Sequence, residues 1–140
     1  GLAVRENDMT APDKLSIIVF SGDYDRIHYA LAMASSAVAI DRAVTLFFTM
    51  DAIHALLRPG AHGARDWSAR ETDYAAKKIG TAEEMLSACI ELGATFMVCE
   101  MGLRATGISL DDLREDVSVA TGSIVSFLND AARHGQMIMI

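Results

Sequence analysis

The chain has 140 residues, of which 51% are hydrophobic and 22% are charged, and its formal net charge at pH 7 is −7. This length and composition are typical of a globular domain with a hydrophobic core rather than of a disordered chain. The negative charge argues against nucleic-acid binding and against docking on an anionic membrane, because both require a basic surface.

The first third of the chain alternates apolar runs with a helical pattern. Residues 15–20 (LSIIVF) and 43–48 (AVTLFF) are rich in β-branched or aromatic side chains, as are strands buried on both faces. Between them, apolar residues recur at helical spacing over 27–38. We expect a short helix over 49–57, beginning at Thr49.

Residues 58–80 lack a strong pattern, apart from a predicted helical turn over 71–78. The segment contains the only tryptophan, Trp67, together with five basic residues. A segment of this length is usually a lid, a binding loop or a partner surface. Two interpretations of its charge stay open, a solvated loop and a docking surface for an acidic or anionic partner.

The remainder of the chain continues the alternation of strands and helices. Thr81 and Glu84 fit a capping box, which predicts a helix ending near Gly93. Further elements are expected as strands over 94–98, 117–120 and 136–140, a turn over 109–112 and a helix over 124–131. The pattern predicts one three-layer α/β domain over 1–140, with a mainly parallel sheet of about five strands and helices on both faces. Residues 1–13 are expected to be a flexible N-terminal segment.

The two cysteines have different sequence contexts. Cys99 directly follows the strand over 94–98, and reactive groups in open α/β sheets gather at the carboxyl ends of strands. Glu100 would disfavour a thiolate there, whereas Arg104 would offset this effect if it lay close. Cys99 can therefore be a reactive thiol or a packed apolar residue. Cys89 falls on the apolar face of the helix that begins at Thr81, which favours packing.

Loops after the first two predicted strands supply further site candidates. In a parallel sheet, Ser21 and Gly22 after the first strand, and Thr49 and His54 after the second, emerge at the same edge as Cys99. Together with Gly102, they are the predicted pocket around a partly accessible Cys99. The histidines do not have metal-ligand spacing, and no glycine-rich dinucleotide motif is present, so we expect neither a metal nor a cofactor.

The sequence also favours a soluble, cytoplasmic protein. Residues 1–15 are polar and unlike a signal peptide. The longest apolar stretch, 30–40, contains two serines and is too short to span a bilayer. Two cysteines are fewer than a small disulfide-stabilised secreted domain usually carries, which favours a reducing compartment.

Residues 17–57 resemble the opening of DsrE/DsrF-like proteins, also described as DsrE/DsrF/DrsH-like. The resemblance is carried by Ser21, Gly22 and Asp25, by Phe-Phe-Thr over 47–49, and by a later cysteine followed by MGL and TGI. It implies sulfur relay, in which Cys99 accepts sulfane sulfur as a persulfide and passes it to a partner protein. It also implies trimers or hexamers and partners such as TusA-like carriers or rhodanese-like proteins.

Two other function classes stay open, so the sequence does not decide whether the protein is an enzyme. The first is a non-catalytic module that binds a small ligand or builds an oligomer on the same fold. The second is a thiol peroxidase with Cys99 as the reacting residue, although no resolving cysteine is evident.

Overall fold

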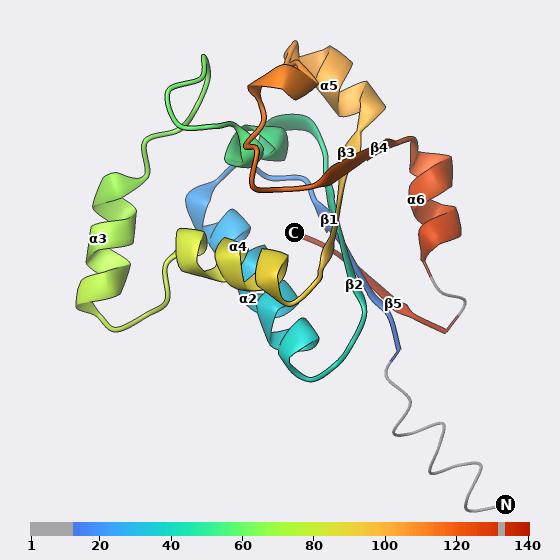
Figure 1. The fold of residues 1–140 in the computed structure, drawn as a ribbon, viewed down its shortest axis with the longest axis horizontal. Coiled ribbons are helices and arrows are strands. Elements are labelled where there is room, and N and C mark those ends of the chain that lie inside the picture. The colour runs from blue at the N-terminus through green and yellow to red at the C-terminus, as the bar shows by residue number, and fades with distance from the viewer. Residues whose placement is uncertain (1–12, 132–133) are drawn as a thin grey trace, which may run out of the picture.

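The computed structural model describes residues 13–131 and 134–140, and the predicted flexible segment lies almost wholly outside them. Five strands form one sheet in the order β4-β3-β2-β1-β5, and every neighbouring pair is parallel (Figure 1). The strands are β1 Leu15–Val19, β2 Val44–Phe48, β3 Thr95–Cys99, β4 Val119–Gly122 and β5 Gln136–Met139. The predicted parallel sheet of five strands is confirmed.

Helices cover both faces of this sheet, as predicted. The α-helices are α2 Tyr24–Ala39, α3 Ser68–Ala76, α4 Ala82–Glu91, α5 Glu100–Thr106 and α6 Ile124–Asp130, and the 3-10 helices are η1 Met50–Leu56 and η2 Leu110–Asp112. Helices α2 and α4 lie on one face and α6 on the other, while α3 stands out beyond α2 and α4 (Figure 1). The predicted turn over 71–78 is part of α3, which begins earlier, at Ser68.

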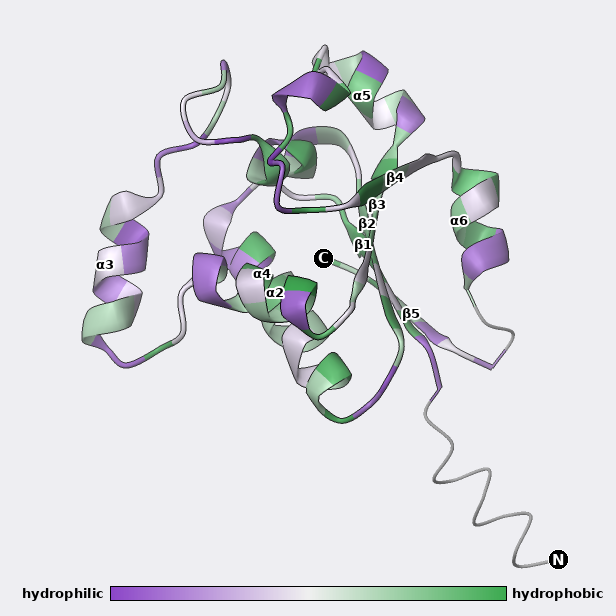
Figure 2. Cartoon of the chain, viewed as in Figure 1, coloured by the Kyte–Doolittle hydropathy of each residue, from purple (hydrophilic) through white to green (hydrophobic). Residues whose placement is uncertain are grey.

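The two faces of the sheet carry cores of unequal size. Alternate residues of the central strands, such as Ile17, Leu46 and Val98, join the large core with α2 and α4. The opposite face holds a small cluster, made of Phe47, Met97, Cys99 and Phe127. Hydrophobic residues follow the strands and also lie on α6, whereas α3 is mostly hydrophilic (Figure 2).

The α4 terminus forms as its sequence predicts. The Thr81 hydroxyl accepts a hydrogen bond from the Glu84 backbone N–H at 3.1 Å, and the Glu84 carboxylate accepts from the Thr81 backbone N–H at 3.2 Å. This capping box satisfies two backbone donors that the first turn of a helix leaves open. The capping box fixes the residue at which α4 begins, and with it the end of the segment over 58–80.

Candidate functional site: a buried thiol at the sheet edge

Cys99 is the last residue of β3 and directly precedes α5, so its backbone lies at the carboxyl edge of the sheet. Its side chain is only 1% exposed. Strand alternation places Met97 and Cys99 on the same face, where Phe127 of α6 packs against them. The expectation that Cys99 is partly accessible is therefore wrong, because α6 covers this part of the sheet.

The cover over Cys99 is a close contact between α6 and the sheet. The rings of Phe47 and Phe127 are stacked, with 4.5 Å between their centroids. At Gly122, the β4 partner of Cys99, a Cβ atom would lie 2.5 Å from Ser126 Oγ of α6 and 2.7 Å from Met97 Cε. A side chain at this position would push α6 away, so glycine allows the helix to seal the thiol.

The predicted pocket residues do not converge on the Cys99 thiol. Thr49 and Gly102 meet where α5 packs on η1, since a Cβ on Gly102 would lie 3.1 Å from Thr49 Oγ1. Ser21 and Gly22 line a shallow cavity of about 490 Å³ at the carboxyl edge, with Asp51 of η1.

His54 lies elsewhere, in a second cavity of about 300 Å³ on the α2 and α4 face. Its Nδ1 is 2.8 Å from the Asp51 carbonyl oxygen. Of these two cavities among the described residues, neither has Cys99 in its lining. The loops do emerge at one edge of the sheet, as a parallel sheet requires. Their residues, however, lie in three separate places: the contact between α5 and η1, the shallow cavity and the second cavity.

Cys89 has the structural role that its spacing predicts. It is fully buried between α4 and α2, and its thiol lies 3.8 Å from the Leu31 carbonyl oxygen. Burial raises the pKa of Cys89 to about 12, so this thiol stays protonated at neutral pH. A protonated, enclosed thiol is a poor nucleophile.

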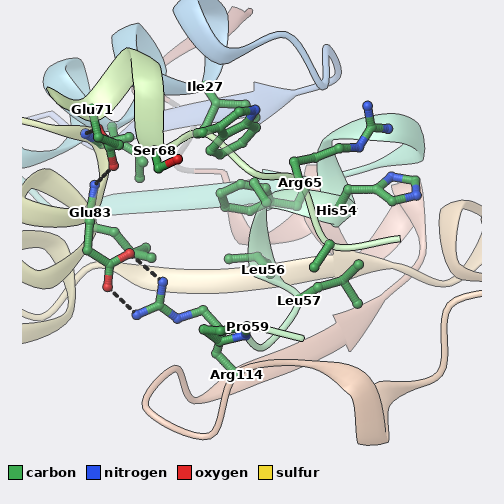
Figure 3. Close-up of a pocket in the computed structure, with 17 residues that line it drawn as sticks. Ile27, His54, Leu56, Leu57, Pro59, Arg65, Ser68, Glu71, Glu83 and Arg114 are labelled. Atoms are coloured by element: carbon green, nitrogen blue, oxygen red, sulfur yellow. Dashed lines mark hydrogen bonds and ion pairs between the residues drawn. The ribbon is translucent and has the colours of Figure 1, made fainter. Parts of the chain in front are cut away.

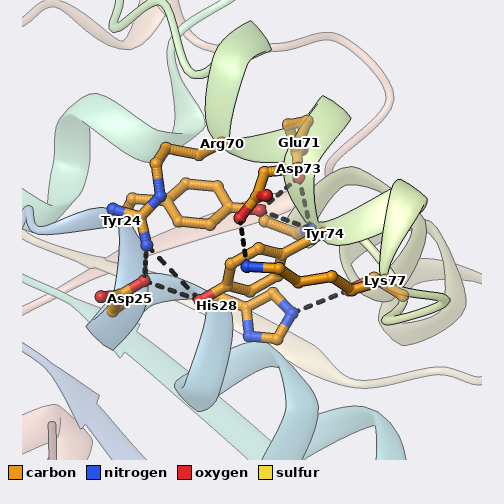
Figure 4. A network of polar contacts seen from close by, with 10 residues as sticks. Tyr24, Asp25, His28, Arg70, Glu71, Asp73, Tyr74 and Lys77 are labelled. Atoms are coloured by element: carbon orange, nitrogen blue, oxygen red, sulfur yellow. Dashed lines mark hydrogen bonds and ion pairs between the residues drawn. The ribbon is translucent and has the colours of Figure 1, made fainter.

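The sequence did not reveal how α3 is attached to the body of the protein. Glu71 of α3 accepts hydrogen bonds from the Tyr24 hydroxyl and from the backbone N–H groups of Ala82, at 3.0 Å, and Glu83, at 3.1 Å (Figure 4). Burial, and then the bond to Glu71, raises the pKa of Tyr24. One carboxylate thus joins α3 to the starts of α2 and α4. No spacing rule links position 71 to these partners.

Around Glu71, aromatic and charged side chains complete the attachment of α3. Arg70 pairs with Asp25 and lies over the rings of Tyr24 and Tyr74, while the Tyr74 hydroxyl donates to Asp25 at 2.8 Å (Figure 4). The Tyr74 hydroxyl bond, together with Arg70, holds the pKa of Asp25 below its ordinary range. Asp25, singled out in the sequence only by resemblance, therefore serves as an anchor for α3.

Most basic residues of the segment over 58–80 are paired with acidic residues of the same chain. The pairs are Arg58–Asp112, Arg65–Asp51, Arg70–Asp25 and Lys77–Asp73. Pairing within the chain leaves less charge to attract an acidic partner, so the interpretation of 58–80 as an anion-docking surface loses its main support. The described segment folds instead as a flap over α2 and α4.

The described residues offer neither a cluster of metal ligands nor a helix that could span a membrane. Residues 13–131 and 134–140 contain no group of three or more histidines, cysteines or carboxylates placed to hold a metal ion. Across the same residues, no helix has the length and apolar character needed to cross a bilayer.

Comparisons with known proteins agree with this architecture. The MTH1491 protein of unknown function from Methanobacterium thermoautotrophicum has a similar structure, with a TM-score of 0.64 and 17% identity, over 91% of this chain and 99% of that one. The ychN protein from E. coli has a TM-score of 0.58 and 18% identity, over 91% and 97% of the two chains. These likenesses concern the fold.

Family membership comes from the sequence itself. The comparison with curated proteins gives no match. The sequence profile of the DsrE/DsrF-like family matches residues 13–134, which is nearly the whole chain. The chain therefore belongs to the DsrE/DsrF-like family.

Proposed function

We propose that this protein is a sulfur carrier that holds sulfane sulfur as a persulfide on Cys99 and passes it to a partner protein. Family membership supports a sulfur-relay role at the level of the family. The observation that carries the assignment to Cys99 is its position at the carboxyl end of β3. The other thiol, Cys89, is held protonated inside the large core.

The proposed chemistry is two successive exchanges that need neither a cofactor nor a second thiol. The Cys99 thiolate attacks a sulfane sulfur, a new S–S bond forms, and the S–S bond of the donor breaks. The shortened donor leaves as a thiolate and takes up a proton. An acceptor thiolate then attacks the outer sulfur of the persulfide, and the Cys99 thiolate leaves. No net oxidant or reductant is consumed.

The apolar enclosure of Cys99 suits storage between these two exchanges. Phe47, Met97 and Phe127 would shield a persulfide from water and from small reducing thiols. Loading and unloading require that α6 moves, since the thiol is 1% exposed. This seven-residue helix buries only Phe127, and its last residue, Asp130, is held by Thr45 and Lys14, so a local opening has to release one ring and these polar contacts.

A second candidate, a binding or assembly module without thiol chemistry, is favoured by the same burial of Cys99. In that case the thiol is one more member of the small cluster beneath α6. The two candidates differ in whether the thiol reacts in the native protein, and a direct test separates them.

Intact mass spectrometry after incubation with polysulfide tests the assignment. We expect the wild type and Cys89→Ser to gain mass in steps of one sulfur atom, and Cys99→Ser to gain none. If Cys99→Ser gains sulfur mass and Cys89→Ser does not, Cys89 is the carrier and the assignment to Cys99 is wrong. If no form gains sulfur from polysulfide, thiosulfate or a loaded rhodanese, the binding module replaces the carrier.

We further propose that the protein is a cytoplasmic homo-oligomer, a trimer or a hexamer, that delivers sulfur to TusA-like or rhodanese-like partners. Large apolar side chains are exposed on one face, on α6 and on edge strand β5. They are Ile124, Val125, Leu128, Met137 and Met139, between 43% and 66% exposed. A second copy that covered them would remove a sizeable apolar surface from water.

Light scattering coupled to size exclusion tests this assembly. At micromolar concentration we expect the mass of three or six chains. Val125→Glu, at the most exposed of these positions, should shift the mass toward that of a single chain. A wild-type protein that elutes with the mass of one chain would reject the proposal.

A further inference from the structure

The flap over 58–80 encloses a cavity of about 300 Å³ against the large core (Figure 3). Its floor is made of side chains that are at most 4% exposed, namely Ile27, Leu31, Phe48, Leu56 and Leu86. The only tryptophan, Trp67, lies in the wall and packs edge-on against Tyr24, with 5.2 Å between ring centroids. Concave, mainly apolar spaces of this size are typical of small-molecule sites.

Charged side chains line the rim of the cavity, and each of them is engaged in hydrogen bonds or ion pairs within the protein. At one end, both guanidinium arms of Arg114 bind the Glu83 carboxylate at 2.6 Å, and Asp116 accepts from Arg114 at 2.7 Å (Figure 3). At the other end, Arg65 donates to Asp51 at 2.7 Å. A charged ligand would have to break one of these pairs or remain unpaired inside an apolar space, and both are costly.

Glu71, the remaining charged residue of the lining, is also fully engaged. Its two oxygens accept from the Tyr24 hydroxyl and from two backbone N–H groups of α4. The other polar residues of the lining include Ser68, Trp67 and His54. Such groups suit a hydroxyl or a carbonyl on a ligand rather than a charge.

We propose that this cavity is a binding site for a small, uncharged, mainly apolar molecule, aromatic or branched, with at most one hydroxyl or carbonyl group. Burial of the apolar body against the floor supplies the affinity, because it removes the apolar surface of the ligand from water. The ion pairs at the rim select against charged molecules of the same shape.

This site is separate from Cys99 and independent of the proposed sulfur chemistry. Phe48 of β2 faces the cavity, whereas its neighbour Phe47 faces the cluster around Cys99. Consecutive strand residues point to opposite faces, so the sheet itself stands between the cavity and the thiol. Cys99→Ser should bind the ligand as the wild type does.

Trp67 fluorescence measures the binding directly, because this residue is the only tryptophan and lies in the cavity wall. The probes are 4-phenylbutan-1-ol, 4-phenylbutyrate and 4-phenylbutylamine, which share a body and differ in charge. We expect saturable binding of the alcohol, at least roughly tenfold tighter than binding of either charged probe. Tighter binding of the acid or the amine would overturn the assignment to uncharged ligands.

A variant that fills the cavity, compared with a matched control, tests where the alcohol binds. Ala64→Phe places a ring at the lining and should abolish binding of the alcohol, while Ala75→Phe places the same ring on an exposed position of α3 and should leave it unchanged. If Ala64→Phe does not fold, Ala55→Leu at another lining position replaces it. Equal binding by the filled and control variants, or no saturable binding of the alcohol by the wild type, would reject the site.

Discussion

Phe127→Ala will lower the free energy of unfolding by about 3 kcal/mol and expose the Cys99 thiol. Phe127 is 1% exposed and is the residue of α6 that the small core buries. Removing its ring takes away the stack on Phe47 and leaves a gap over Met97 and Cys99. Urea denaturation gives the stability, and the rate at which iodoacetamide alkylates Cys99 gives its accessibility.

Alkylation of the two cysteines shows whether the opening is local. If α6 alone moves, Cys99 of Phe127→Ala reacts faster while Cys89, in the other core, stays protected. Equal acceleration at both thiols would mean global unfolding instead. Asn129→Ala, at an exposed position of the same helix, is the control and should change neither stability nor alkylation measurably. Unchanged alkylation of Cys99 in Phe127→Ala would show that another element seals the thiol.

The fold was largely predictable because its signals are local. The runs over 15–20 and 43–48 are largely apolar on both faces, which is typical of strands in a parallel sheet covered by helices. The Thr81 and Glu84 capping box also forms from residues close in the chain. Each of these elements is specified within a few residues, so one sequence was enough to place them.

The site was less predictable because it depends on contacts between distant segments. The end of β3 indicates the sheet edge for Cys99, but not which face its side chain takes or that Phe127 covers it. Likewise, the sequence around Glu71 predicts only a helical turn and gives this residue no special role. Its partners lie 47 positions before it and 11 and 12 positions after it. Neither periodicity nor motif spacing reports such pairings.

The two sides of the sheet therefore have different physical characters. The Cys99 side is closed by one short helix whose outer surface is apolar. The opposite side has a large core and a polar flap held by specific hydrogen bonds and ion pairs. A change in the flap should leave Cys99 unaffected.

Glu71→Ala tests this separation and should lower the free energy of unfolding by about 3 kcal/mol, because it leaves a buried hydroxyl and two helix N–H groups without their acceptor. We also expect α3 to detach, which limited proteolysis within 58–80 would detect, while alkylation of Cys99 stays slow. The control Thr72→Ala changes an exposed neighbour on the same helix and should have little effect.

A pH series tests whether Tyr24 is held as a neutral phenol in the folded protein. Because burial and Glu71 raise the pKa of Tyr24, the folded state keeps the phenol protonated at a pH where the unfolded chain, with an ordinary pKa of 10.0, begins to lose its proton. This contribution is fully present below pH 10 and declines as the pH rises further. Wild-type stability should therefore fall more steeply above that pH than the stability of Tyr24→Phe, which has no proton to lose. Parallel curves for the two proteins would mean that folding does not raise the pKa of Tyr24.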